Sequence, residues 1–300
     1  MGYKKVLITG GSGLLGYNLI KTFSHHKTKY KVFGIYFKNC IFPENCIGLK
    51  LDLRNSSDVK KTMEKIKPDI IIHCAALTDV DLCEKEKDEC YQTNVISTKN
   101  LCDYKPKKFI YISTDAVYPG ITGNYSEDSE TRPVNYYGQT KLEAEKIVSQ
   151  LEDNSILRVN IFGINPTNKL SLAEWFIKKF KNGEPIKGFT DVYFNPILVN
   201  HLSDIIIETI ERNITGLYNI GSPDIISKYE FGIKVAEVFK FNTNLISKSL
   251  SKEINFVAKR PKNPTMDISK AKKLLEAKLL NVDDGLKEMK ELMENGWLKN

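Results

Sequence analysis

Tyr137 and Lys141 are four residues apart, the spacing at which two side chains share one face of a helix. A free tyrosine has a pKa of about 10, so it is almost wholly protonated at neutral pH and a poor acid–base catalyst. A neighbouring ammonium favours the phenolate and lowers that pKa. The pair is therefore a candidate for proton transfer in carbonyl/alcohol interconversion, provided that a cofactor carries the hydride.

The spacing alone is not specific, because three Tyr-x-x-x-Lys pairs occur in the sequence. One lies in the helix expected after a glycine loop, where it would pack, and a second is interrupted by Pro106. Tyr137 and Lys141 instead follow a strand that ends at Thr114, and they open a helix with apolar positions on one face. Without a cofactor site nearby, an exposed aromatic beside a solvated lysine would be the simpler interpretation.

A glycine-rich loop, Gly10-Gly-Ser-Gly-Leu-Leu-Gly16, follows the first expected strand directly and opens the first expected helix. In this context glycines let backbone amides approach a pyrophosphate, and the helix N-terminus adds a favourable partial charge. The spacing is Gly-x-x-Gly-x-x-Gly, and tight packing between strand and helix is the alternative explanation. We expect a dinucleotide to contact Gly10, Ser12, Gly13, Leu14, Leu15 and Gly16.

Residues after the next three expected strands bear on the rest of the cofactor. The second strand is followed by Lys38 rather than by the acidic residue that binds a ribose 2′-hydroxyl. NADP(H) is therefore slightly favoured over NAD(H), although Lys38 could also be simply exposed. Asp52, with Leu53 beside it, could accept a hydrogen bond from the adenine amino group. Ala75 and Ala76 are small enough to let the cofactor approach the sheet edge.

Composition argues against several other classes of protein. The formal net charge of +7 comes from lysines spread along 300 residues, not from the focused basic face that nucleic-acid binding requires. No run approaches the ~18 apolar residues of a membrane helix, and the first residues lack the apolar segment of a signal peptide. The six cysteines form no Cys-x-x-Cys pair, so we expect reduced thiols and no metal site. We therefore expect a cytoplasmic protein that binds neither nucleic acid nor membrane.

Short β-branched runs alternate with amphipathic stretches in the first half, a pattern that predicts a parallel sheet covered by helices on both faces. Strands are expected at 6–9, 32–36, 47–51, 70–74, 109–113 and 156–159, and helices at 14–23, 59–66, 83–101 and 136–150. After Gly163 the pattern becomes irregular, with helices expected at 172–181, 202–211, 228–239, 269–275 and 286–295.

The predicted fold class is α/β, a Rossmann-type doubly wound parallel sheet with a smaller C-terminal substrate domain. Residues 1–165 would form the NAD(P)-binding Rossmann domain, and residues 166–300 the substrate-binding domain. Part of 196–220 would return to the first domain.

Seven stretches carry a resemblance to a known family: ITGGSGLLG (8–16), PDIIIHCAALTDVDLCE (68–84), TNV (93–95), YISTDAVYPG (111–120), NYYGQTKLEAE (135–145), LRVNIFG (157–163) and RPKNPTMD (260–267). With these, the sequence resembles the extended short-chain dehydrogenase/reductases and, within them, the dTDP-4-dehydrorhamnose reductase branch. The resemblance covers nearly the whole chain. It implies NAD(P)H-dependent reduction of a nucleotide-activated 4-keto-6-deoxy sugar by a homodimer.

The resemblance also implies roles for single residues. Tyr137 would be the general acid, Lys141 would bind the nicotinamide ribose and lower the pKa of Tyr137, and Thr114 would hydrogen-bond the sugar carbonyl oxygen. Elementary chemistry agrees, because hydride addition to a carbonyl builds negative charge on its oxygen, and a hydroxyl and a phenol are suitable donors.

Thr78, Asp79, Val80 and Asp115 would line the sugar site by the same resemblance. For the first three, ordinary helix capping is the alternative. Arg260 could pair with the substrate diphosphate in bidentate fashion, or it could form a structural salt bridge. Related 4,6-dehydratases carry Thr-Asp-Glu where this chain has Thr-Asp-Ala, and Ala116 cannot supply the second carboxylate that dehydration needs.

Two alternatives remain open from the sequence. A nucleotide-sugar epimerase usually shows an acidic residue after the second strand, which is missing here. A non-catalytic regulatory subunit resembling the methionine adenosyltransferase beta subunit would use the fold as a docking surface. The branch's usual Trp after the "LR" strand and its Pro-Thr pair are replaced by Val159-Asn-Ile161 and Pro196-Ile197, so the sugar itself is not determined.

Overall fold

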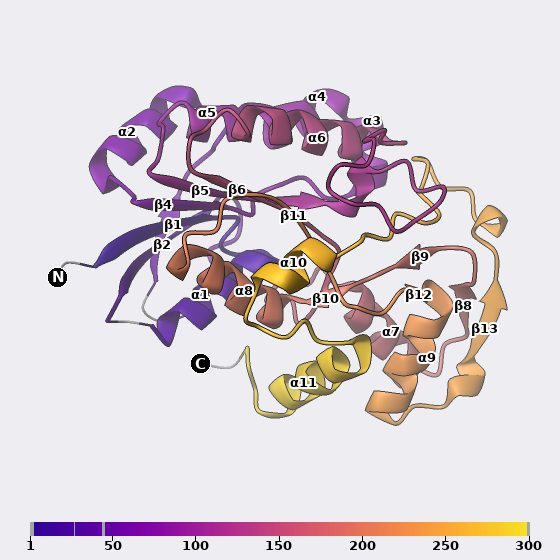
Figure 1. The fold of residues 1–300 in the computed structure, drawn as a ribbon. Helices are drawn as coiled ribbons and strands as arrows, with labels where there is room; N and C mark the ends of the chain where they lie inside the picture. Colours follow the sequence, from indigo (N-terminus) through magenta and orange to yellow (C-terminus); the bar gives the residue numbers. More distant parts are fainter. Residues whose placement is uncertain (1–2, 27, 44–45, 299–300) are drawn as a thin grey trace.

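A parallel sheet of seven strands organises the chain (Figure 1). The structure is a computed structural model that describes residues 3–26, 28–43 and 46–298. The strand order is β3-β2-β1-β4-β5-β6-β11, with β1 Lys4–Thr9, β2 Tyr30–Tyr36, β3 Ile47–Lys50, β4 Ile70–His73, β5 Lys108–Thr114, β6 Asn154–Val159 and β11 Gly216–Ile220. The order reverses direction between β1 and β4, and ligands of such sheets bind at the carboxyl ends of the strands near this point. The predicted Rossmann-type fold is confirmed.

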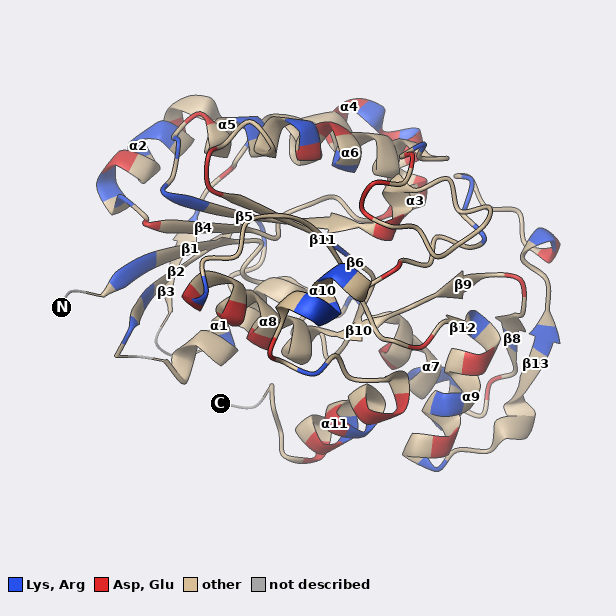
Figure 2. Cartoon of the chain, in the orientation of Figure 1, with Lys and Arg blue, Asp and Glu red and all other residues tan. Residues whose placement is uncertain are grey.

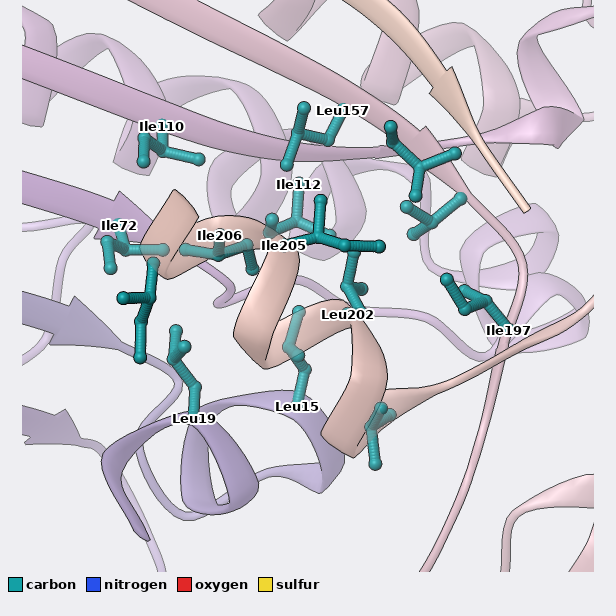
Figure 3. Packing of buried hydrophobic residues seen from close by; sticks show 14 of the residues in the cluster. Leu15, Leu19, Ile72, Ile110, Ile112, Leu157, Ile197, Leu202, Ile205 and Ile206 are labelled. Carbon is teal, nitrogen blue, oxygen red and sulfur yellow. The ribbon is translucent and has the colours of Figure 1, made fainter. Parts of the chain in front are cut away.

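Helices cover both faces of the sheet because its central strands are apolar on both sides (Figure 1). One face is covered by α1 Leu14–Ser24 and α8 Val199–Glu211, and the other by α2 Ser56–Ile66, α5 Ser97–Cys102 and α6 Tyr136–Val148. Figure 3 shows the first of these interfaces, where side chains of α1 and α8 meet those of β4, β5 and β6. The labelled residues there are Leu15, Leu19, Ile72, Ile110, Ile112, Leu157, Ile197, Leu202, Ile205 and Ile206.

The single helix expected over 83–101 is wrong. The segment consists of α3 Val80–Lys85, α4 Lys87–Tyr91, a π-helical turn η1 Gln92–Ile96 and then α5. Glu86 interrupts the first two with non-helical dihedrals, φ −113° and ψ 66°. The π turn holds Asn94, whose buried side chain bonds the backbone of a neighbouring loop, so a long-range contact overrides the local helical periodicity.

A second hydrophobic cluster lies beside the sheet, around Phe162, Phe176, Phe231 and Leu286. Its elements are α7 Leu172–Lys181, α9 Lys228–Phe239 and α11 Val282–Glu294, with the short strands β7 Ile161–Phe162, β8 Ile186–Phe189, β9 Tyr193–Phe194, β10 Ile197–Leu198, β12 Ile226–Ser227 and β13 Ile246–Ser249. The remaining short helices are η2 Asp115–Val117, η3 Thr243–Leu245, η4 Ser251–Glu253 and α10 Ser269–Leu274. Capping boxes at Ser171 and Ser227 begin α7 and α9.

After the first elements of this second cluster, the chain returns to the seven-stranded sheet. Strand β11 pairs in parallel with β6, with Leu217 opposite Ile156, and α8 packs in the same core as α1. The domain boundary near residue 165 stays a prediction. Positions occupied by basic and acidic residues alternate along the outer helices, as the blue and red segments of α2 and α11 show (Figure 2). Within the described ranges, no helix has the length and apolarity to cross a membrane.

Candidate active site

The glycine loop is packed so closely that side chains would not fit. Gly10 has φ +64°, and an added Cβ would lie 2.9 Å from the amide nitrogen of Ala75 at the end of β4. A Cβ on Gly16 would overlap the carbonyl oxygen of Gly10. These two glycines therefore let the start of α1 lie directly against the carboxyl ends of β1 and β4.

The N-terminus of α1 offers free hydrogen-bond donors. Its N-cap is Gly13, which provides no side-chain cap, and its first turn contains no acidic residue. Tyr17 is the first residue of this turn whose amide bonds back, to Gly13 at 3.0 Å. In the described part of the chain, the amides of Leu14, Leu15 and Gly16 have no acceptor. This donor set and the side-chain-free cradle fit a dinucleotide pyrophosphate.

The two residues expected at the adenine end have different surroundings. Lys38 is exposed beyond β2. Asp52 is held by Arg54, which donates to its two carboxylate oxygens at 2.8 and 2.7 Å, and this pairing lowers the pKa of Asp52. The Arg54 guanidinium lies 5.0 Å from the ring centroid of Phe37, so an arginine that we did not predict stands beside Asp52. The Asp-x-Arg spacing in the sequence was the signal that could have identified Arg54.

Leu53 is 7% exposed, and its side chain belongs to the core between the sheet and α2. Only its backbone can therefore contact a ligand. Ala75 and Ala76 are partly exposed at the end of β4, where the Ala75 amide donates to Thr9 Oγ1 at 3.1 Å.

The structure brings Thr114, Tyr137 and Lys141 together. Helix α6 begins at Tyr136, where the Asn135 side chain caps it by accepting from the Gly138 amide at 2.9 Å. A Cβ on Gly138 would overlap the carbonyl oxygen of Ala116, so α6 packs directly on η2, which follows β5. The half-buried Tyr137 thus lies beside Thr114, whose hydroxyl contacts the phenol.

Lys141 does not act on the phenol as predicted. Its Nζ donates to the carbonyl oxygen of Ile112 at 2.7 Å and lies 4.1 Å from the ring centroid of Tyr111. Burial lowers the pKa of Lys141 to about 7. Burial also raises the pKa of Tyr137 above its ordinary value, and the Thr114 hydroxyl opposes that rise. The expected lowering by Lys141 is therefore wrong for this arrangement, because the ammonium is turned towards β5 and desolvation dominates.

A buried ion pair fixes α6 one helical turn beyond Lys141. Arg158 of β6 donates to Glu145 through Nε at 3.0 Å and Nη2 at 2.7 Å, and through Nη1 to the Tyr118 hydroxyl at 2.7 Å. Ser113 also donates to Glu145. The negative charge of Glu145 opposes the effect of burial on the pKa of Lys141. Residues of β5, β6 and α6 are thereby joined behind the catalytic candidates.

Contacts on the substrate side join the two halves of the molecule. Arg260 lies 3.0 Å from Asp81 in an ion pair, so of the two predicted alternatives the structure shows the salt bridge. Thr78 is exposed, and its hydroxyl accepts from Lys169 at 2.9 Å. Val80 is the first residue of α3. Thr78, Val80 and Asp81 lie in the segment that follows β4.

Asn94 is a site residue that we did not assign. Its Oδ1 accepts from the Leu77 amide at 2.7 Å, and its Nδ2 donates to Thr140 Oγ1 at 3.0 Å. It therefore connects the loop after β4 to α6, between Tyr137 and Lys141. The signal was the Thr-Asn-Val motif at 93–95. Asn160 and Lys228, described below, had no sequence signal.

A hollow of about 380 Å³ lies elsewhere, lined by residues that include Tyr3, Phe23, Tyr30 and Ile47. These residues stand at the amino ends of β1, β2 and β3 and at the end of α1, at the opposite edge of the sheet from Thr114. The hollow brings no cluster of acid–base groups together, so the chemistry belongs to the carboxyl ends of the strands.

Known proteins are similar to this chain over nearly its whole length. A probable low-salt glycan biosynthesis reductase of Haloferax volcanii is 27% identical over 288 residues, covering 93% of this chain and 95% of that protein. Methionine adenosyltransferase 2 subunit beta of Xenopus laevis is 28% identical over 283 residues, covering 90% of this chain and 82% of that protein.

Solved structures also match over nearly the whole length. A hypothetical dTDP-4-dehydrorhamnose reductase from Sulfolobus tokodaii is 32% identical with a TM-score of 0.83, covering 94% of this chain and 98% of its own. The dTDP-4-dehydrorhamnose reductase from Bacillus anthracis, in complex with NADP, is 26% identical with a TM-score of 0.84, covering 97% and 99%. The family described as "RmlD substrate binding domain" matches residues 4–294. With the reductase-like site and this match, the chain belongs to the RmlD substrate-binding-domain family.

Proposed function

We propose that this chain is an NAD(P)-dependent oxidoreductase that reduces the 4-keto group of a nucleotide-activated 6-deoxy sugar. The proposal rests on the position of Thr114, Tyr137 and Lys141. They lie where β5 and α6 meet, at the same edge of the sheet as the glycine loop. Family membership and the reductases among its relatives support the same activity.

The chain's own residues supply binding and proton transfer. A reduced nicotinamide dinucleotide, when bound, supplies a hydride to the carbonyl carbon. The amides of the α1 N-terminus hold its pyrophosphate. As the carbon–oxygen π bond breaks, its electron pair takes the proton of the Tyr137 hydroxyl, so that a CH–OH group and a phenolate result. The Thr114 hydroxyl donates a hydrogen bond to the same oxygen, and Lys141 would bind the nicotinamide ribose, as the family resemblance implies.

We propose NADPH as the preferred cofactor. Lys38 follows β2 where an acidic residue would bind a 2′-hydroxyl, and the Arg54 guanidinium lies in the same region above Phe37. Lys38→Ala should weaken NADPH binding by about three- to tenfold, because one exposed charge contact is lost, and leave NADH binding unchanged. Titration followed by nicotinamide fluorescence measures both, with the exposed Lys252 replaced by Ala as the control. Equal loss for the two cofactors would contradict the preference.

The proposed substrate class follows from residues near Thr114. Asp115 is retained, whereas Ala116 provides no second carboxylate, which favours reduction over elimination of water. The reductase relatives are named for dTDP-4-dehydrorhamnose, and the proposal extends to this chain only the class of nucleotide-linked 4-keto-6-deoxy sugars. Departures at Val159 and Ile197 leave the sugar undetermined by the motifs.

We also propose a homodimer, formed through the helical segments 83–101 and 136–150 as the family resemblance implies. Light scattering should then give twice the chain mass of 34.2 kDa. A monomer at micromolar concentration would contradict this assembly.

The activity is tested by mixing the protein with NADPH and candidate nucleotide 4-keto sugars and following the loss of reduced-nicotinamide absorbance. Oxidation should occur with at least one sugar and should be lost in Tyr137→Phe, which keeps the ring but removes the proton donor. A protein that binds NADPH but turns over no sugar, and that instead co-purifies with a methionine adenosyltransferase, would establish the regulatory alternative.

A further inference from the structure

Asp115 is a buried carboxyl group that the proposed proton transfer leaves without a role. It is 4% exposed and begins η2, directly after Thr114. Its Oδ1 lies 3.1 Å from Thr114 Oγ1, and its Oδ2 accepts from Asn160 Nδ2 at 2.7 Å. Among the described residues, no cationic nitrogen lies within 4.0 Å of it. Burial raises the pKa of Asp115, whereas Asn160 and the charge of Lys228 lower it.

Lys228 belongs to the other half of the molecule, and its charge acts on Asp115. It is the first residue of α9. It follows β12, which pairs antiparallel with β9 so that Ile226 lies opposite Phe194. Its Nζ lies 3.1 Å from the centroid of the Phe194 ring. No carboxylate oxygen of the described residues lies within 4.0 Å of this nitrogen. Burial lowers the pKa of Lys228 to about 7, and Asp115 opposes this change.

The Thr114 hydroxyl has one proton and more than one group that requires it. Its oxygen already accepts from the Ala116 amide at 3.2 Å. An ionised Asp115 is only an acceptor, so it takes the Thr114 proton. The Tyr137 phenolate and the substrate oxygen need the same proton. A neutral Asp115 can instead donate to Thr114, which leaves the hydroxyl free to donate towards the reaction.

We infer that Asp115 is a positioning residue whose charge decides the direction of the Thr114 hydrogen bond, and that Lys228 sets this charge from the opposite half of the molecule. The inference rests on the proposed reductase function and deepens it. Thr114 from β5 and Asn160 from the β6–β7 connection hydrogen-bond Asp115, and the charges of Lys228 from α9 and of Asp115 itself act on Asp115 and on Tyr137 of α6, respectively. The negative charge of Asp115 also raises the pKa of Tyr137. Its neutral form therefore favours proton donation by both hydroxyl groups.

The ionisation of Asp115 can be measured without substrate or cofactor. The side-chain carboxyl carbon is followed by ¹³C NMR against pH, and Asp115→Asn identifies its signal. Because a nearby positive charge lowers the pKa of a carboxyl group, the Asp115 midpoint should rise by roughly 0.5 to 2 pH units in Lys228→Met. Lys248→Met is the matched control, because Lys248 also lies near an aromatic ring, at 5.6 Å from that of Tyr229, but is exposed. Equal midpoints in wild type and Lys228→Met would overturn the inference.

Kinetics test the link to Thr114. The wild-type kcat should fall as Asp115 ionises, and this fall should move to higher pH in Lys228→Met, with the change in kcat rather than in KM. Asp115→Asn should remove the fall, because a neutral amide cannot become a negatively charged acceptor. A wild-type pH profile that persists in Asp115→Asn would refute the role of Asp115. If wild type turns over no sugar, the proposed function fails, and the NMR midpoints alone decide whether Lys228 controls Asp115.

Discussion

Replacing Arg158 by Met tests whether the buried ion pair stabilises the base of the catalytic helix. Arg158 and Glu145 are 3% and 5% exposed, and the guanidinium makes three hydrogen bonds, two of them to Glu145. Methionine fills part of the volume but leaves a buried carboxylate without its partner. Removing one member of such a pair costs about 3–5 kcal/mol, because the remaining charge keeps its desolvation penalty.

Urea unfolding measures the loss directly, and thermal unfolding gives an independent value. With about 2–4 °C of Tm for each kcal/mol in a chain of this size, Arg158→Met should lower Tm by roughly 6–20 °C. Lys29→Met is the control, because its pair with Glu211 is 59% and 37% exposed and should contribute far less to stability than a buried pair.

The double variant Glu145→Leu/Arg158→Met separates pairing from packing. It should recover most of the stability lost in Arg158→Met, because an apolar pair of similar volume carries no buried charge. A loss of unfolding free energy below about 1 kcal/mol in Arg158→Met would refute the reasoning. So would a double variant whose loss of unfolding free energy exceeds the sum of the losses in the two single variants.

Three further outcomes are expected. Tyr137→Phe should lower kcat by about 10²–10⁴ and leave the Kd for NADPH within about twofold of wild type. A smaller loss of kcat, measured in stopped assays, would exclude Tyr137 as the acid. Gly16→Ala should weaken NADP⁺ binding in calorimetry and cost about 1–3 kcal/mol of stability, because its Cβ overlaps the Gly10 carbonyl; wild-type affinity would contradict the cradle. Burial lowers the pKa of Lys141 to about 7, so between that pH and the ordinary pKa of about 10.4 the unfolded chain binds one more proton. The free energy of unfolding should therefore rise with pH, relative to that of Lys141→Met, by about 1 kcal/mol per pH unit above pH ~7. If urea unfolding gives the same difference between the two proteins at every pH, the lowered pKa of Lys141 is refuted.

Predictions from local pattern were successful where the physical cause is local. The glycine spacing at 10–16 identified the turn between β1 and α1, because a positive φ at Gly10 and the close approach at Gly16 permit no other residue type. The continuous apolar runs identified β4 and β5, which are buried on both faces. The continuous helix expected over 83–101 was wrong, and its π-helical turn was not predicted, because the side chain of Asn94 bonds a segment that is distant in sequence.

The sequence by itself determined the fold class, the glycine cradle and the helical pair Tyr137 and Lys141, since each depends on residue type and spacing within one element. Only the tertiary structure decided where the Lys141 ammonium points, because Ile112 and Tyr111 of another strand hold it. It also decided that the charge of Lys228 acts on Asp115, although 113 positions separate them in the chain. Burial and charge at these sites are sums over neighbours from many elements, and no local pattern contains that sum.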